Sequence, residues 1–563
     1  MRSFRATTMV VVLAAAGGLR AMEGQGATRA HAGSNRTSAA ITAADLRTRL
    51  FLIADDSMAG RETGSIGDFT AANYIASEFK RLGMIPKGED GDWFQTVPFW
   101  IPAPESRSLS IDGGGTIAFG RDYVEVVLGR PAAAGPGPFD VVYGGSVYDS
   151  AAWIDAAHAA GKLVVLDIGA TNGDAPVQLN PIATSRHFAG AAGIALARPD
   201  LTPDATANFM RYTPRPDTTR FAGRPAMILM TMHAADLLLG TAAGARHVGD
   251  AGRRVTGSIS LHYVPVAYPA RNVIGVVEGS DPKLRGEYVS LTAHNDHVGI
   301  CMSAVDHDSM RAFLHVLRPM GADTRNWNET PEADATIHAM IDSMRRLHPP
   351  RADSICNGAD DDGSGTAAIL ELAESFASLP MAQRPRRSIL FVSHVAEERG
   401  LVGSAWFTDH ATVPVDSIVA EIDEDMVGRG TAWDLPKGGP TYLEVVGARR
   451  LSNEFGDLLE AANRKQRVPF VFNYEFDAPH HPLQYYCRAD HYSYARYGIP
   501  SVAFSRGEHL DYHQVTDEPQ YIDYDDMLRV VQMVHDAALG IGNLDHAPRL
   551  DQPKGDPHAR CVQ

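Results

Sequence analysis

Three short apolar runs in the second half of the chain each end at a histidine or an aspartate. The runs are VSLTAH at 289–294, ILFVSH at 389–394 and IVAEID at 418–423. Runs that are apolar without strict alternation predict strands buried on both faces, as in a parallel sheet. Because the carboxyl ends of parallel strands form one edge, where open α/β sheets bind ligands, the side chains that follow these runs are expected to meet there.

Strand and helix patterns alternate from Arg271 onward. Strands are predicted at 272–278, 288–294, 388–394, 417–423, 442–447 and 500–505. Helices are predicted after Gly363, after Gly400, at 451–464 and at 524–539. This alternation predicts an α/β fold in which helices cover both faces of a mostly parallel central sheet.

Other parts of the chain differ in their hydrophobic pattern and glycine content. Residues 41–135 begin with helical patterns, whereas 136–262 contain short apolar strands with Gly-rich turns and predict an inserted, mainly-β domain. The sheet pattern occupies 263–545, and 302–352 form an insertion with apolar residues at helical spacing, which is expected beside the edge of the sheet where these side chains meet. Residues 546–563 are predicted to be a flexible tail.

The N-terminus has the layout of a secretory signal. Arg2 and Arg5 precede an apolar run at 9–19, and small residues follow. We therefore expect residues 1–32 to be a signal peptide and disordered N-terminus, and the protein to be secreted or periplasmic. The alternative is a disordered N-terminus of a cytosolic protein. With no Cys after the run and no second long apolar run, no membrane anchor is expected.

Composition and net charge limit the classes of partner that the protein is expected to bind. The chain has 563 residues, of which 44% are hydrophobic, and a net charge of −17. A net negative charge disfavours nucleic acid and anionic membranes, which bind basic surfaces. Four cysteines are too few for a disulfide scaffold. Cys301 and Cys356 flank the insertion and could form a disulfide or stay as two buried thiols, which would leave Cys487 and Cys561 over.

Four candidate ligands lie in or just past apolar runs, and a fifth lies further along the chain. They are His294, Asp361, Glu398 and Asp425, with His513 as the fifth. Imidazole mixed with carboxylate oxygen suits zinc or a similar divalent ion. Five ligands are too many for one four-coordinate site that also holds water. The set therefore predicts two metal ions sharing one carboxylate.

The ordered motifs resemble family twenty-eight of the metallopeptidases, the co-catalytic di-zinc exopeptidases. The motifs are HND at 294–296, GADDDGSG at 358–365, AEERGLVGS at 396–404, DMVG at 425–428, DHYSY with GIP at 490–500, and YHQVTD at 512–517. The resemblance implies the zinc exopeptidase fold, two Zn²⁺ per chain and a peptide substrate. It also implies that 41–135 belong to the peptidase domain and that 136–262 are a protease-associated domain.

The resemblance and the chemistry together suggest roles. Glu398 is implied to bind metal and Glu397 to act as general base, a task that a carboxylate near two cations can perform. Asp361 is expected to bridge the metals, with a cis peptide to Asp362, and Asp296 to orient His294. Glu397, Asp296 and Tyr486 are the catalytic candidates.

Neighbouring residues are given other roles. Tyr486 is the preferred oxyanion donor and Tyr512 the second choice, while Asp517 is available to orient His513. Supporting positions rather than metal ligation are expected for Asp360, Asp362, Asp423 and Glu424, although Asp423 competes with Asp425 for ligation. Five histidines are set aside as ligands: His297, His480, His481, His491 and His509.

An aminopeptidase is the leading function. A carboxypeptidase acting on acidic C-termini would need an Arg cluster in the pocket, which Arg399, Arg488 and Arg506 could supply. A glutaminyl cyclase uses one metal, and a non-enzymatic receptor on this scaffold would have lost ligands. Retention of all five ligands disfavours both.

Overall fold

The computed structural model describes residues 37–104, 108–125, 137–168, 181–199, 201, 224–259, 261–324, 327 and 329–563. The predicted signal peptide lies outside these residues. Among the helices of the described residues, none combines the length and the apolar character needed to cross a membrane.

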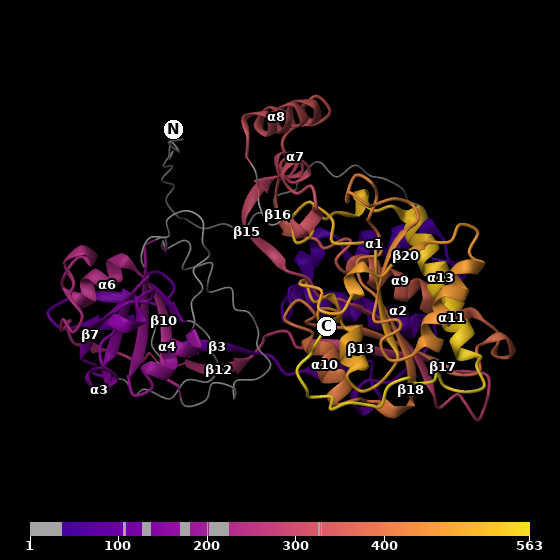
Figure 1. Cartoon of the computed structure of the whole chain (residues 1–563), viewed down its shortest axis with the longest axis horizontal. Coiled ribbons are helices and arrows are strands. Elements are labelled where there is room, and N and C mark those ends of the chain that lie inside the picture. The colour runs from indigo at the N-terminus through magenta and orange to yellow at the C-terminus, as the bar shows by residue number, and fades with distance from the viewer. Residues whose placement is uncertain are drawn as a thin grey trace, which may run out of the picture. The chain divides into compact units, whose positions relative to one another are not determined.

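The core is built on one nine-stranded sheet (Figure 1). Its order is β1-β13-β17-β14-β18-β21-β19-β20, and β2 also pairs with β13. The four strands from β17 to β21 in this order are parallel, whereas β13 and β19 join them in antiparallel fashion. The strand bounds are β1 (Ile85–Pro86), β2 (Phe94–Val97), β13 (Ala270–Val277), β14 (Tyr288–His294), β17 (Ser388–His394), β18 (Ile418–Glu424), β19 (Tyr442–Val446), β20 (Val471–Asn473) and β21 (Ser501–Ser505).

Helices cover both faces of this sheet, which confirms the predicted fold class. On β17, Ile389 and Phe391 pack into one buried cluster and Leu390 and Val392 into another, because successive side chains of a strand point to opposite faces. The first cluster includes residues of α1 (Ala43–Ile53), α2 (Ile66–Arg81), α9 (Gly363–Ser378), α11 (Asn453–Lys465) and α13 (Tyr524–Gly542). The second includes residues of α10 (Val402–Asp409) and α12 (His491–Ala495).

A second lobe has its own sheet and core. Its five strands are ordered β6-β10-β9-β8-β7, with three parallel pairs and β6 antiparallel at one edge. The lobe elements are β4 (Ser108–Ile111), β5 (Thr116–Ala118), β6 (Tyr123–Glu125), β7 (Val141–Ser146), α3 (Ala156–Ala159), β8 (Leu163–Asp167), α4 (Pro181–His187), β9 (Gly193–Arg198), β10 (Ala226–Thr231), α6 (Met232–Leu239) and β11 (Val255–Thr256). Strands β3 (Trp100–Pro104) and β12 (Leu261–Pro265) pair with each other at its two chain boundaries.

The lobe begins earlier in the chain than the sequence predicted. We expected residues up to 135 to belong to the peptidase domain, but β6 pairs with β10 and β4 pairs with β11. Pairing between strands so distant in sequence leaves no local signal, which explains the misplaced boundary. The interpretation of the lobe as a protease-associated domain stays a prediction.

The predicted insertion is a two-stranded ribbon that carries two helices. Strand β15 (Gly299–Asp306) pairs with β16 (Ala352–Cys356), and α7 (His307–Leu317) and α8 (Pro331–Arg345) lie between them. Arg311 forms a 2.9 Å ion pair with Asp511, and Arg318 donates to the carbonyl of Leu510 at 2.8 Å. The insertion therefore contacts the loop that leads to His513.

The C-terminal segment is bound to the core rather than a flexible tail. Cys487 and Cys561, which we expected to be left over, form a disulfide with Cα atoms 5.9 Å apart. The side chain of Gln563 accepts from the backbone N–H of Tyr486 at 3.1 Å. Cys356 is itself in a disulfide, but the side chain of its expected partner Cys301 lies outside the described residues, so that pairing stays a prediction.

Replacing Cys561 by Ser is expected to destabilise the folded core. The disulfide closes a sequence separation of 74 residues, and in the chain-entropy model such a bridge contributes roughly 4 kcal/mol to the free energy of unfolding. Calorimetry should show a lower Tm for Cys561→Ser and for Cys487→Ser, and the double variant should fall no further than either. An additive loss in the double variant would mean that the two thiols act separately.

Candidate metal centre

Loops at the carboxyl edge of the parallel strands bring together the predicted ligands. His294 is the last residue of β14, Asp425 directly follows β18, and Glu398 follows β17 after a short turn. Asp361 precedes α9. The neighbouring ends of parallel strands explain why residues far apart in sequence meet here.

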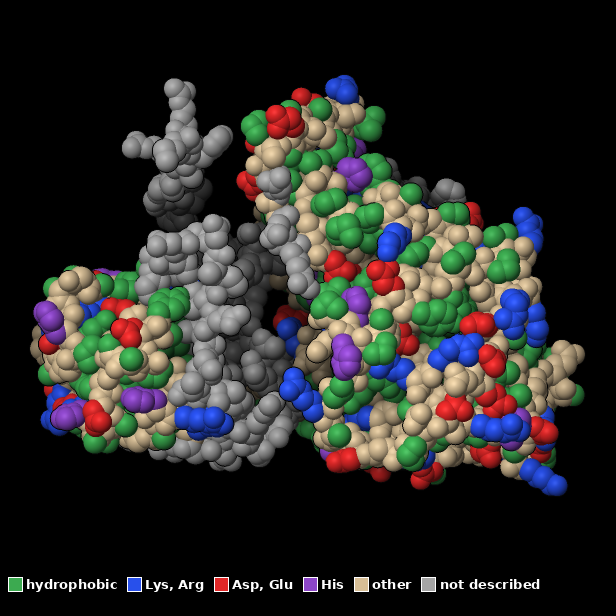
Figure 2. Space-filling view, viewed as in Figure 1, with side chains coloured by type: hydrophobic (Ala, Val, Ile, Leu, Met, Phe, Trp, Pro, Cys, Tyr) green, Lys and Arg blue, Asp and Glu red, His purple; other side chains and the backbone are tan. Residues whose placement is uncertain are grey.

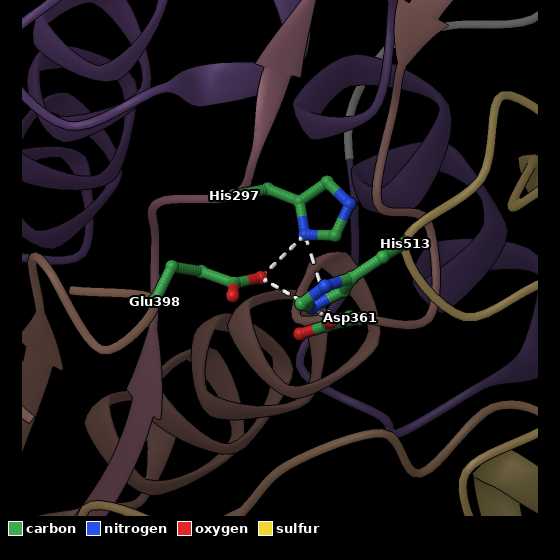
Figure 3. A group of neighbouring side chains, drawn as sticks. All are labelled: His297, Asp361, Glu398 and His513. Carbon is green, nitrogen blue, oxygen red and sulfur yellow. Dashed lines mark ion pairs between the residues drawn. The ribbon is translucent and has the colours of Figure 1, made fainter. Parts of the chain in front are cut away.

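Four side chains form one potential metal site: His297, Asp361, Glu398 and His513 (Figure 3). The Glu398 Oε1 atom lies 2.9 Å from His297 Nδ1 and 3.1 Å from His513 Nε2. The Asp361 Oδ2 atom lies 3.0 Å from His513 Nε2 and 3.6 Å from His297 Nδ1. All four ligand atoms thus face one point.

A second potential site shares Asp361 with the first. The Nε2 atom of His294 lies 3.2 Å from Asp361 Oδ1 and 3.7 Å from Asp425 Oδ1. Asp361 therefore turns one oxygen toward each site, which is the geometry required of a bridging carboxylate. Asp423, the competing candidate, instead accepts hydrogen bonds from Thr292 and from the backbone of His491.

The donor atoms fit two divalent ions. Six buried ligand atoms make no hydrogen bond within the described chain: His294 Nε2, His297 Nδ1, Asp361 Oδ2, Glu398 Oε1, Asp425 Oδ1 and His513 Nε2. The distances between neighbouring ligand atoms, 2.9–3.7 Å, bracket the roughly 3.3 Å between ligand atoms of a tetrahedral zinc site. Buried polar atoms without hydrogen bonds are rare and costly, and bound cations would satisfy all six.

His297 is an addition that sequence reasoning set aside. It follows His294 by three residues, beyond the end of β14, and its backbone N–H donates to the carbonyl of Arg61 at 3.1 Å. This bond to a distant loop fixes the turn that returns the imidazole to the cluster. The repeated His of HNDH was a possible signal, but the path of the turn was not readable from it.

Asp296 supports the centre differently from our expectation. The Nδ1 atom of His294 lies 3.0 Å from the backbone carbonyl of Asp296, whereas the carboxylate of Asp296 lies 3.6 Å away. That carboxylate accepts from the backbone N–H of Glu397 at 3.1 Å and from the hydroxyl of Thr63 at 2.8 Å. Asp296 thus connects the loop of His294 to the loop of Glu397.

Two further carboxylates accept hydrogen bonds from backbone N–H groups rather than facing the metal sites. Asp362, joined to Asp361 by the expected cis peptide, accepts from the backbone N–H of His294 at 3.0 Å and of Gly365 at 2.9 Å. Asp517, which we expected to orient His513, accepts from the backbone N–H of Asp361 at 3.2 Å. Both side chains position ligand loops.

Three residues at the centre have left-handed backbone conformations. The φ angles are 63° for Ala396, 60° for Met426 and 58° for His513. Such conformations cost on the order of 1–3 kcal/mol each for residues other than Gly. These conformations change the direction of the chain next to Glu397 and Asp425 and at His513 itself. The surrounding packing therefore stabilises a strained backbone at the positions that orient the ligands.

Arg61 is a positioning residue that sequence reasoning missed. It ends the 3₁₀ helix Asp56–Arg61 and is fully buried. Its guanidinium donates to the carbonyls of Asn295 at 2.9 Å, Asn357 at 2.6 Å and Gly358 at 2.8 Å. One side chain therefore ties together the loops that carry His294 and Asp361.

A pocket opens beside the centre. Its empty volume is about 570 Å³, which includes space open to solvent. Asp361, Glu397 and Asp425 line the side that faces the candidate metal centre. Burial raises the pKa of Glu397 well above its ordinary value, His294 opposes this shift, and the nearby carboxylates of Asp425 and Glu398 add to it. Such an accumulation of buried negative charge favours the binding of cations.

The structure places Tyr486 away from this pocket. Its ring packs under the guanidinium of Arg450, 4.1 Å from ring centre to carbon, and the pocket is lined by Tyr485 and Tyr512 instead. Tyr486 and Tyr485 lie in a 3₁₀ turn in which adjacent side chains diverge, and sequence alone could not tell which one faces inward. Tyr512, the second choice, stacks on His513 with ring centres 3.8 Å apart.

Figure 2 shows one face of the molecule, on which Lys and Arg side chains are scattered among Asp and Glu. The predicted absence of nucleic acid as a partner stays a prediction.

Comparison with known proteins finds similarity to aminopeptidases. Leucine aminopeptidase 1 from Paracoccidioides brasiliensis (strain Pb18) is 34% identical over 185 residues, which are 31% of this chain and 44% of that protein. Aminopeptidase NAALADL1 from Rattus norvegicus is 49% identical over 97 residues, 17% of this chain and 13% of that protein. The chain thus spans less than half the length of these relatives.

A solved structure and a family model also match. The zinc aminopeptidase from Bacillus subtilis aligns with 89% of this chain and 95% of its own, at 17% identity and a TM-score of 0.49. The model of peptidase family M28 matches residues 272–538, which contain all of the ligands described above. The core that carries the candidate metal centre therefore belongs to peptidase family M28.

Proposed function

We propose that this protein is an exported di-zinc aminopeptidase that removes N-terminal residues from peptides. The observation that carries the proposal is the group of six buried ligand atoms without hydrogen bonds, arranged as two sites around Asp361 and adjoining a pocket. The sites would be held by His297, Glu398 and His513 on one side and by His294 and Asp425 on the other.

Two bound zinc ions would polarise the peptide carbonyl and lower the pKa of water. The chain itself supplies Glu397, whose carboxylate lines the pocket 4.0 Å from His294 Nε2. Glu397 would take the proton of the attacking water and pass it to the leaving amine. Tyr512 lines the same pocket and would donate to the developing oxyanion.

Three arginines weigh against the carboxypeptidase alternative. Arg399 pairs with Glu62 at 2.9 Å, and the buried Arg506 pairs with Asp526 at 2.8 Å. Of the three, Arg488 lines the pocket, where it pairs with Glu508 at 3.1 Å. A site for a C-terminal carboxylate needs unpaired cations. The carboxylates that line this pocket, among them Glu397 and Glu444, instead suit an N-terminal ammonium group.

Export is supported by the disulfide between Cys487 and Cys561, because such bonds persist in oxidising compartments. N-terminal sequencing of the protein recovered outside the cytoplasm should show a start beyond the apolar run at 9–19.

The enzymatic proposal is tested by comparing a leucine or arginine anilide with an N-acetylated dipeptide that ends in glutamate. We expect the enzyme to hydrolyse an anilide. Addition of a chelator should lower this activity by at least about 100-fold, and addition of zinc should restore it. The acetylated peptide should remain intact, since its N-terminus carries no charge. Cleavage of the acetylated dipeptide would instead support the carboxypeptidase.

A further inference from the structure

Two neighbouring strands of the sheet, β19 and β21, form one wall of the pocket beside the metal centre. Side chains of β19 and β21 line it, and Glu444 and Val446 point into it while Leu443 and Val445 pack into the main core on the opposite face. Because successive side chains of a strand alternate, the position of Glu444 inside the pocket is fixed by the packing of its neighbours.

Glu444 carries an oxygen without a partner. The residue is 2% exposed, its Oε1 atom accepts from the hydroxyl of Tyr442, and its Oε2 atom makes no hydrogen bond within the described residues. A buried carboxylate oxygen left in this state is costly, so the arrangement points to a donor that arrives with the substrate.

The charges around the pocket favour a positively charged donor. Glu508 also lines the pocket, and its partner Arg488 neutralises it at 3.1 Å. The Arg488 guanidinium is thereby committed to Glu508, while Glu444 retains an oxygen for another partner. Burial raises the pKa of Glu444 to about 8, Tyr442 opposes this shift, and Glu508 and Asp323 add to it. An incoming cation would stabilise the ionised carboxylate.

We propose that Glu444 selects substrates whose first residue has a cationic side chain, lysine or arginine, by pairing with that side chain. This inference rests on the proposed aminopeptidase function and assigns its substrate class. A leucine side chain in the same pocket would leave the Oε2 atom buried and without a partner. Sites that are built around a polar contact discriminate strongly against residues that lack the matching group.

The experiment compares kcat/KM for arginine, lysine, leucine and glutamate p-nitroanilides in the wild type and in Glu444→Gln. The wild type should prefer arginine and lysine, and Glu444→Gln should lower the ratio of arginine to leucine by about 10- to 100-fold, the range expected for a hydrogen bond to a charged group. Gln has the same shape and can still accept from Tyr442. The matched control is Glu475→Gln, an exposed carboxylate paired with Lys437, which should keep the wild-type ratio.

A binding measurement separates this inference from the proposed function. Calorimetry with free L-arginine and L-leucine needs no turnover, and arginine should bind more tightly to the wild type but lose its advantage in Glu444→Gln. Hydrolysis of none of the anilides would overturn the aminopeptidase and leave this binding difference as the readout. Three results would overturn the role of Glu444: a preference for leucine or glutamate, a uniform loss with all anilides in Glu444→Gln, or equal binding of both amino acids to the wild type.

Discussion

Replacement of Glu397 by Gln is expected to reduce kcat by about 10²–10⁴-fold, the usual contribution of general acid-base catalysis, while both metal ions stay bound. The carboxylate of Glu397 lines the pocket, and Glu398 beside it faces His297 and His513 in the metal cluster. Gln cannot accept a proton from water, but its replacement of Glu397 leaves all the cluster atoms in place.

The measurement pairs kcat on an aminoacyl anilide with metal analysis of the dialysed protein. Glu398→Gln serves as the matched comparison, because it changes the adjacent residue and should lower the metal content. If Glu397→Gln lost metal and Glu398→Gln kept it, the roles of the two residues would be exchanged.

Replacement of Asp361 by Ala is expected to empty both metal sites. Asp361 presents Oδ1 to His294 and Oδ2 to His297 and His513, so the substitution removes a ligand from each site at once. The Ala variant should therefore bind less than one equivalent of zinc at concentrations that saturate the wild type, and activity should fall with it.

Asp296→Ala is the comparison for this second prediction. The carboxylate of Asp296 lies outside the cluster and holds Glu397 and Thr63, so its loss should weaken metal affinity or activity by about 10–100-fold. Zinc titrations monitored by calorimetry, with circular dichroism as a check of folding, give both values. Equal metal loss in the two variants would contradict a bridging role for Asp361.

Much of the core was readable from the sequence because its determinants are local. Apolar runs without alternation predicted the parallel strands, and polar residues just past such runs predicted that His294, Asp361, Glu398 and Asp425 would meet at one edge. His513, further along the chain, was added to complete a set of metal ligands. All five lie in the observed cluster. Their functional roles stay predictions, to be decided by the variants above.

Tertiary structure decided the features that depend on contacts between distant segments. A bond to the loop of Arg61 turns His297 into the cluster, and a one-residue difference in a 3₁₀ turn places Tyr485 rather than Tyr486 in the pocket. The disulfide of Cys487 with Cys561 and the early start of the second lobe likewise depend on long-range pairing.

Glu444 shows the physical reason most clearly. In the sequence it is one acidic residue within an apolar strand, and such a residue can be paired, exposed or functional. Only the tertiary structure shows that one of its oxygens has no partner, because it shows that Glu444 faces the pocket and that Arg488 pairs with Glu508 instead. Local patterns thus determined the strands and their terminal ligands, whereas the pairing of each buried charge was decided by which distant groups the fold brings within hydrogen-bonding distance.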